Sequence, residues 1–159
     1  MSNYKEGFEN RINLNIAENK AVKFYKDQGI KIIRYGFNGY DEEERIEKQD
    51  FFKIPEKMRK LPDYLIITDK AYLLEVKGCN DILRIKTMDM QGYDFWDKIV
   101  PIVLFAYSTA FNACYRVKYY KLKELLKDMG KKDVYPDNNK EFNYIEVKEL
   151  ALIGQFCKC

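Results

Sequence analysis

The sequence predicts a mixed α/β fold in which helices flank a mixed central sheet. Three patterns support this prediction: helical spacing of apolar residues in 11–28, two adjacent apolar runs in 63–76, and the apolar run PIVLFAY at 101–107. A chain of 159 residues has room for one domain with one core. We therefore expect a single domain over residues 1–159, with a core over about 11–130 and a C-terminal extension over about 131–159.

The first half of the chain alternates between helical and extended patterns. Residues 11–28 place apolar side chains on one helical face, and Gly29 stands where a C-terminal cap belongs. The β-branched run at 30–37 predicts a strand. Residues 41–50 hold six acidic and two basic groups, which indicates a solvated loop or a short exposed helix. Runs 63–68 and 71–76 then predict a β-hairpin, central in the sheet because both faces are apolar.

The second half continues the alternation. The predicted elements are a helix at 82–98, a buried strand at 101–107, an amphipathic strand at 115–120, a helix at 121–129 ended by Gly130, a loop at 130–140 and a last edge strand at 142–147.

The composition restricts the possible chemistry. The chain has no histidine, which excludes Ser-His-Asp and Cys-His catalysis and zinc sites that need imidazole. Serine occurs only at positions 2 and 108. The side chains left to carry catalytic chemistry are carboxylates, lysines and thiols. The four cysteines lack C-x-x-C spacing, so we expect free thiols, with a zinc site or a redox pair in the tail as weaker alternatives (Cys79, Cys114, Cys157, Cys159).

The charge and the N-terminal segment bear on partners and location. A net charge of +3 neither requires nor excludes nucleic acid. No apolar run reaches the roughly 18 residues that span a bilayer, and the segment MSNYKEGFENR lacks the apolar stretch of a signal peptide. We therefore expect a cytoplasmic protein with no membrane partner.

The predicted hairpin holds the strongest functional signal. Side chains alternate along a strand, so Glu75 and Lys77 share a face. A three-residue connection centred on Asp69 sets Asp63 opposite Glu75, whereas a two-residue turn would move Asp63 to the other face. The hypothesis of a functional cluster therefore predicts the wider turn or a bulge.

Two carboxylates and an ammonium at the end of an apolar strand are costly unless they are paired or bind a metal. Asp63, Glu75 and the backbone carbonyl of Val76 are hard oxygen ligands that suit Mg²⁺, with Mn²⁺ as a substitute. Such an ion activates water beside a phosphate, and Lys77 would orient the water or stabilise the transition state. The alternative is a structural Glu75–Lys77 pair at a strand end.

Pro62-Asp63, eleven further residues and Glu75-x-Lys77 resemble the PD-(D/E)XK motif of the restriction-endonuclease-like nuclease superfamily. The motif is short, but it falls on a hairpin after a helix and a strand and before a helix. The resemblance covers about two thirds of the chain and implies an αβββαβ core. It also implies metal-dependent hydrolysis of phosphodiesters, with Asp63 and Glu75 as metal ligands and Lys77 as a catalytic residue.

Glu18 lies on the apolar face of the first predicted helix, between Leu14 and Ala21. An inward carboxylate needs a partner. In many members of the resembled superfamily a glutamate of this helix reaches the metal, and Glu18 resembles that catalytic and metal-binding residue. The alternative is a rotated helix with Glu18 half-exposed beside Lys20 or Lys23.

The remaining candidates concern nucleic-acid binding. Residues 115–132 hold seven basic and two acidic groups, which is typical either of a phosphate-binding track or of an ordinary solvated face. On the helix predicted at 82–98, Tyr93 either stacks on bases or belongs to the core, and Trp96 is expected in the core. The predicted nucleic-acid contacts are Lys86, Gln91, Tyr93, Arg116, Lys118, Lys121 and Lys123.

The sequence therefore predicts a small Mg²⁺-dependent nuclease that acts without a covalent intermediate. The chain has no room for a separate specificity domain, so we expect structure-directed cutting of DNA rather than RNA by a homodimer. Junction resolvases and the repair or packaging nucleases of phages and mobile elements are similar in scale. Without histidine, activity is expected to rise with pH as bound water and Lys77 titrate. The alternative is a non-catalytic nucleic-acid-binding or assembly module with the same fold.

Overall fold

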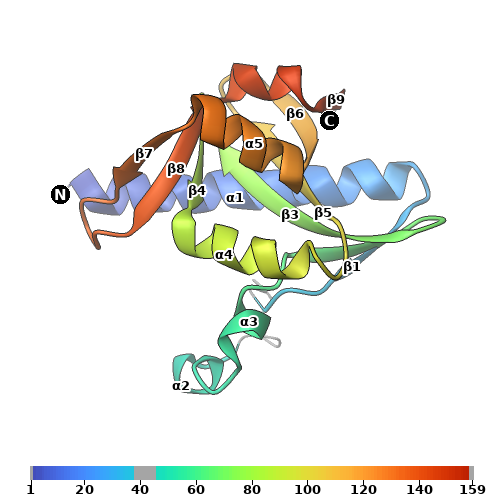
Figure 1. Ribbon diagram of the computed structural model, residues 1–159, viewed down its shortest axis with the longest axis horizontal. Coiled ribbons are helices and arrows are strands. Elements are labelled where there is room, and N and C mark those ends of the chain that lie inside the picture. Colours follow the sequence, from blue (N-terminus) through green and yellow to red (C-terminus); the bar gives the residue numbers. More distant parts are fainter. Residues whose placement is uncertain (1, 38–45, 158–159) are drawn as a thin grey trace.

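The computed structural model describes residues 2–37 and 46–157, with side chains for 15–37, 46–47 and 49–157. Helices and strands alternate along the chain (Figure 1). The elements are α1 (Ser2–Asp27), β1 (Lys31–Arg34), α2 (Lys48–Phe51), α3 (Glu56–Arg59), β2 (Tyr64–Ile67), β3 (Ala71–Cys79), β4 (Ile82–Lys86), α4 (Thr87–Trp96), β5 (Ile102–Ser108), β6 (Ala113–Lys118), α5 (Tyr119–Met129), β7 (Lys131–Val134), β8 (Glu141–Glu146), the 3₁₀ helix η2 (Val147–Leu152) and β9 (Gln155–Cys157).

A six-stranded mixed sheet forms the centre of the fold, with the order β1-β2-β3-β5-β6-β9. β3 and β5 are parallel, and the other neighbouring strands are antiparallel. The parallel pair requires a crossover, and β4 and α4 supply it between β3 and β5. The prediction of a mixed central sheet flanked by helices is confirmed.

The hairpin of β2 and β3 has the three-residue connection that the functional hypothesis requires. Ile67 pairs with Ala71 and Tyr64 pairs with Leu74, so the connection is centred on Asp69. The hydroxyl of Thr68 bonds to the carbonyl of Lys70 across this turn, at 2.9 Å.

Helices cover both faces of the central sheet (Figure 1). One core cluster joins Ala17, Ala21 and Tyr25 of α1 to one face, where Leu74 and Val76 of β3 lie. The alternate residues of β3 and β5 face the other cluster, which contains Tyr93 of α4 and the apolar side of α5 (Tyr119, Leu122, Leu125, Leu126). Successive side chains of β3 therefore point to opposite faces of the sheet and pack in different core clusters.

A second, three-stranded sheet has the order β4-β8-β7, and it corrects three expectations. Residues 82–86 are a strand rather than the start of a helix, because Leu83 and Ile85 are buried while Arg84 and Lys86 are exposed. Residues 131–134 are a strand rather than a loop, paired with β8 although all four side chains are exposed. The run at 142–147 forms most of β8, which is the central strand of this sheet rather than an edge.

Several boundaries also differ from the predictions. The first helix begins at Ser2 rather than at residue 11, and the strand predicted at 30–37 is limited to β1. Gly29 caps α1 at a positive φ of 68°. The N–H of Gly29 donates to the carbonyl of Lys26, and the N–H of Ile30 donates to the carbonyl of Tyr25. In the acidic segment 41–50, residues 48–50 belong to α2, and residues 41–45 lie outside the described part.

Two further expectations can be compared with the structure. Cys79 and Cys157 are thiols, whereas Cys114 is disulfide-bonded, so the prediction of free thiols is wrong for Cys114. Within the described ranges, no helix combines the length and apolar character needed to cross a bilayer.

Candidate functional site

β3 places Glu75 and Lys77 on the same face of the central sheet, toward α4. Glu75 is only 7% exposed, and its Oε1 lies 2.7 Å from the Nζ of Lys77. Val76, between them, points to the α1 layer with an exposure of 1%. The apolar alternation that anchors β3 therefore forces the two charged side chains to one side.

Asp63 immediately precedes β2, and the register of the hairpin sets it across from Glu75. Its Oδ2 accepts a 2.8 Å hydrogen bond from the backbone N–H of Val76. Gly36 closes over this point: its N–H donates to the carbonyl of Asp63, and a Cβ at Gly36 would lie 3.0 Å from the carbonyl oxygen of Pro62. The close approach of the backbone beside Asp63 thus leaves little room for a side chain at position 36.

The environment of Asp63 opposes a negative charge. Burial raises the pKa of Asp63 well above its usual value, and the nearby charge of Glu75 raises it further. The charge of Lys77 and the hydrogen bond from Val76 act in the opposite direction but do not compensate. The positive charge of Lys77 therefore does not fully offset the two carboxylates, Asp63 and Glu75.

Tyr93 of α4 belongs to this cluster. Its hydroxyl donates a 2.6 Å hydrogen bond to Oε1 of Glu75, and its side chain is 3% exposed. The prediction that Tyr93 stacks on bases is therefore wrong, because no base can reach a buried ring. Trp96, in contrast, packs against the core as expected and donates its indole N–H to the carbonyl of Lys57 at 2.8 Å.

Lys77 remains a cation in this setting. Burial alone would lower the pKa of Lys77, but the charges of Glu75 and other acidic groups raise it well above its usual value. Asp89 of α4 lies 3.7 Å from its Nζ. The expected rise of activity with pH is therefore not supplied by Lys77 near neutral pH, where Lys77 acts as a fixed positive charge.

Glu18 points inward as predicted, with an exposure of 7%. Its Oε2 lies 2.6 Å from Arg34 of β1 and 3.5 Å from the hydroxyl of Tyr64. The alternative partners are otherwise engaged: Lys23 pairs with Asp27, and Lys20 lies over the ring of Tyr107. Sequence reasoning missed Arg34, whose only signal is a basic residue in an apolar strand.

Glu18 is electrostatically coupled to the hairpin carboxylates. Burial raises the pKa of Glu18, although Arg34 lowers it, and the charge of Glu75 contributes a further increase. Glu18 in turn adds to the raised pKa of Asp63. The three carboxylates therefore act on one another across the sheet.

The donor set suits a divalent metal ion only in part. Glu75 uses Oε1 for Lys77 and Tyr93, and Asp63 uses Oδ2 for Val76. Within the described residues, the other oxygen of each carboxylate has no hydrogen-bond partner. Carboxylate oxygens that accept no hydrogen bond are hard ligands that suit Mg²⁺ or Mn²⁺. Yet in the described part of the chain no three Asp, Glu or Cys side chains form a ready metal cage, and Glu18 is held by Arg34.

The predicted nucleic-acid contacts divide between separate surfaces. Lys86 ends β4 and Gln91 lies on α4, and both are exposed. Lys121 and Lys123 lie on α5, where Lys123 pairs with Asp94 at 2.8 Å. Lys118, at the end of β6, is exposed.

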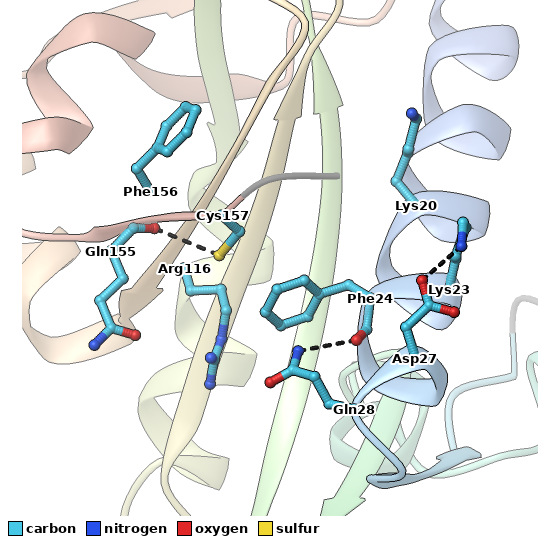
Figure 2. A pocket seen from close by; sticks show the side chains of 9 residues that line it. All are labelled: Lys20, Lys23, Phe24, Asp27, Gln28, Arg116, Gln155, Phe156 and Cys157. Atoms are coloured by element: carbon cyan, nitrogen blue, oxygen red, sulfur yellow. Dashed lines mark hydrogen bonds and ion pairs between the residues drawn. The ribbon is translucent and has the colours of Figure 1, made fainter.

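Arg116 lies on the other side of the sheet from α5. Its guanidinium is 5.4 Å from the ring centres of both Phe24 and Tyr25 of α1. Arg116 lines a cavity of about 620 Å³ between α1, β6 and β9 (Figure 2). The segment 115–132 therefore does not form one continuous basic track, because β6 and α5 turn their cations to different faces.

Comparisons with known proteins assign no family. Neither the family models nor the curated proteins contain a match to this chain. Among solved structures, the chain is similar to a nuclease from a fusselovirus, with 11% identity over 89% of this chain and 84% of that chain and a TM-score of 0.49. This likeness is too distant to identify the chemistry, which therefore has to be argued from the geometry of the site.

Proposed function

We propose that this protein is a divalent-metal-dependent nuclease of the PD-(D/E)XK type. One observation supports this above all: the hairpin register that sets Asp63 across from Glu75, with Lys77 2.7 Å from the Glu75 carboxylate. The elements α1, β1, β2, β3, α4 and β5 follow the order of the αβββαβ core of that superfamily, with α2 and α3 added between β1 and β2 and β4 added before α4.

In the proposed mechanism, Asp63, Glu75 and the carbonyl of Val76 would hold Mg²⁺ or Mn²⁺, and Glu18 would be a further ligand if it were not paired with Arg34. The ion would supply Lewis-acid activation of water and charge stabilisation at phosphorus. Lys77 stabilises the negative charge that develops on the phosphate. Tyr93 holds Oε1 of Glu75, which orients the carboxylate.

The finer proposals are DNA as the substrate, structure-directed cutting and a homodimer. They include recognition of nucleic-acid shape rather than sequence. These proposals rest on the resemblance of the motif formed by Asp63, Glu75 and Lys77.

A panel of plasmid, linear duplex, single strands, four-way junction and RNA, each with Mg²⁺, Mn²⁺ or EDTA, tests the proposal. We expect metal-dependent cleavage that Lys77→Ala and Glu75→Gln abolish while their unfolding transitions stay cooperative. Lys148→Ala, on the exposed side of η2, is the matched control. Cleavage that survives both site substitutions would contradict the proposed site.

One observation favours a second candidate, a non-catalytic nucleic-acid-binding module. The Glu18–Arg34 ion pair occupies the carboxylate that would complete the metal site. Retained nucleic-acid binding, with no turnover of any substrate in the panel, is the result that this candidate predicts.

A further inference from the structure

The three-stranded sheet presents a basic and aromatic outer face. Across it, Arg84 of β4 pairs with Tyr144 of β8, which pairs with Lys131 of β7. The next row is Lys86, Phe142 and Asp133. Directly paired residues project to the same face, and the opposite face is buried through Leu83, Ile85 and Ile145. We define the outer face by Arg84, Lys86, Lys131, Tyr135, Phe142 and Tyr144.

The aromatic rings of the outer face contact one another in series. The ring centres of Tyr135 and Phe142 are 4.4 Å apart, and those of Phe142 and Tyr144 are 5.9 Å apart. The guanidinium of Arg84 lies 5.8 Å from the Phe142 ring centre. Phe142 is 6% exposed, whereas Tyr135 and Tyr144 are half-buried, so the two tyrosines offer ring surface to a ligand.

The outer face adjoins the candidate catalytic site. Lys86 ends β4 directly before α4, which carries Asp89 and Tyr93 (Figure 1). Burial raises the pKa of the Tyr135 hydroxyl, and the charges of Lys77 and Asp89 both act on it. A strand that runs along Lys86 toward α4 therefore approaches Asp89, which lies 3.7 Å from the Nζ of Lys77.

We propose that the outer face binds single-stranded nucleic acid and leads it toward the hairpin cluster. The proposal rests on the proposed nuclease function and names an unpaired strand as its substrate class. Aromatic rings bind bases by stacking, with cations along the backbone. An intact duplex hides its base faces in its own stack, so these tyrosines would contribute little to duplex binding. The two paired rows carry three cations, Arg84, Lys86 and Lys131, and one acidic residue, Asp133. This excess of positive charge attracts phosphate groups.

Fluorescence anisotropy of a short labelled oligothymidylate with the full chain, in EDTA, tests the proposal. We expect Tyr144→Leu to weaken binding about tenfold, as for the loss of one stacked base, while Tyr144→Phe retains it. Arg84→Gln should reduce the slope of log affinity against log salt by about 0.7, the value for one lost phosphate contact. Tyr120→Leu is the matched control, since Tyr120 is 48% exposed on α5.

The proposal is overturned if Tyr144→Leu binds like the wild type, if Tyr120→Leu weakens binding equally, or if blunt duplex competes as well as the single strand. Hydrolysis of bis-nitrophenyl phosphate separates this outcome from failure of the nuclease function. The wild type should hydrolyse this small diester even if the outer face binds no strand, because the diester needs only the hairpin cluster. If the wild type hydrolyses neither this diester nor any nucleic acid, but Tyr144→Leu still weakens strand binding, the binding face stands and the nuclease function is refuted.

Discussion

The hydroxyl of Tyr93 donates a 2.6 Å hydrogen bond to Oε1 of Glu75, the same oxygen that lies 2.7 Å from Lys77. α4 is thereby connected to β3 at the charged centre of the hairpin. One oxygen of Glu75 is held by two donors, which gives the carboxylate a defined orientation. This relationship suggests that Tyr93 is a positioning residue.

Tyr93→Phe removes this hydrogen bond and keeps the ring that packs edge-on against Tyr119. We expect cleavage to slow about tenfold, since a hydrogen bond to a charged group contributes roughly 1.5–3 kcal/mol. The Mg²⁺ concentration for half-maximal activity should also rise. Single-turnover rates over a Mg²⁺ series measure both effects. Tyr119→Phe serves as the control, and equal effects in the two variants would argue against the positioning role.

Asp63→Asn should separate stability from activity. The amide oxygen can still accept the hydrogen bond from Val76, while the repulsion from Glu75 disappears. We expect the metal-free variant to be stabilised by on the order of 1 kcal/mol, because an ionised Asp63 is unfavourable in the fold, and to lose cleavage. Thermal unfolding in EDTA and the plasmid assay measure the two properties. Asp69→Asn, in the exposed turn of the same hairpin, should change neither.

The stability of the metal-free protein should fall as pH rises above about 4. Asp63 and Glu18 have raised pKa values in the fold, so the folded state binds more protons than the unfolded state above their ordinary pKa values of 3.8 and 4.5. The cost is absent below those values and grows until the pH passes the folded-state pKa. Each carboxyl contributes up to about 1.4 kcal/mol per pH unit in that window.

Urea unfolding at several pH values, with EDTA or Mg²⁺, measures this dependence. Mg²⁺ should flatten the profile, because a bound cation favours the ionised carboxylates. The glutamates with lowered pKa values have the opposite sign, but they are fully exposed and screened by water (Glu56, Glu141, Glu146). A metal-free protein that gains stability between pH 5 and pH 7 would contradict the assignment.

Arg34→Gln should show whether Glu18 can act as a ligand. Loss of the ion pair leaves a buried carboxylate without its cation, which we expect to cost about 2 kcal/mol in EDTA, less than for a fully buried pair because Arg34 is 26% exposed. Mg²⁺ should restore more stability to this variant than to the wild type. Calorimetric titration with Mg²⁺ measures the affinity directly. If Arg34→Gln and the double variant Glu18→Gln/Arg34→Gln bind Mg²⁺ equally well, Glu18 is not a ligand.

The central hairpin was predictable because its information is local. Two apolar runs separated by Asp69 and Lys70 leave few possible registers, and only the three-residue connection brings Asp63 across from Glu75. The cap at Gly29 is also local, since a positive φ favours glycine. In contrast, Ile82 and Ile85 match helical spacing by coincidence, and only pairing with β8 reveals the alternation of Leu83 and Ile85.

The sequence by itself determined the mixed sheet and the apolar runs of the hairpin, because periodicity acts over a few residues. It left two alternatives each for the hairpin turn and for Glu18, and the structure shows a three-residue connection and an inward Glu18. Tertiary structure alone decided the partners: Arg34 for Glu18, Tyr93 for Glu75, and α1 rather than α5 for Arg116. It also decided that the exposed strand β7 forms, since polar residues in 131–134 have no intrinsic strand pattern and depend on the backbone of β8. Contacts between residues distant in the chain depend on packing, which local spacing does not encode.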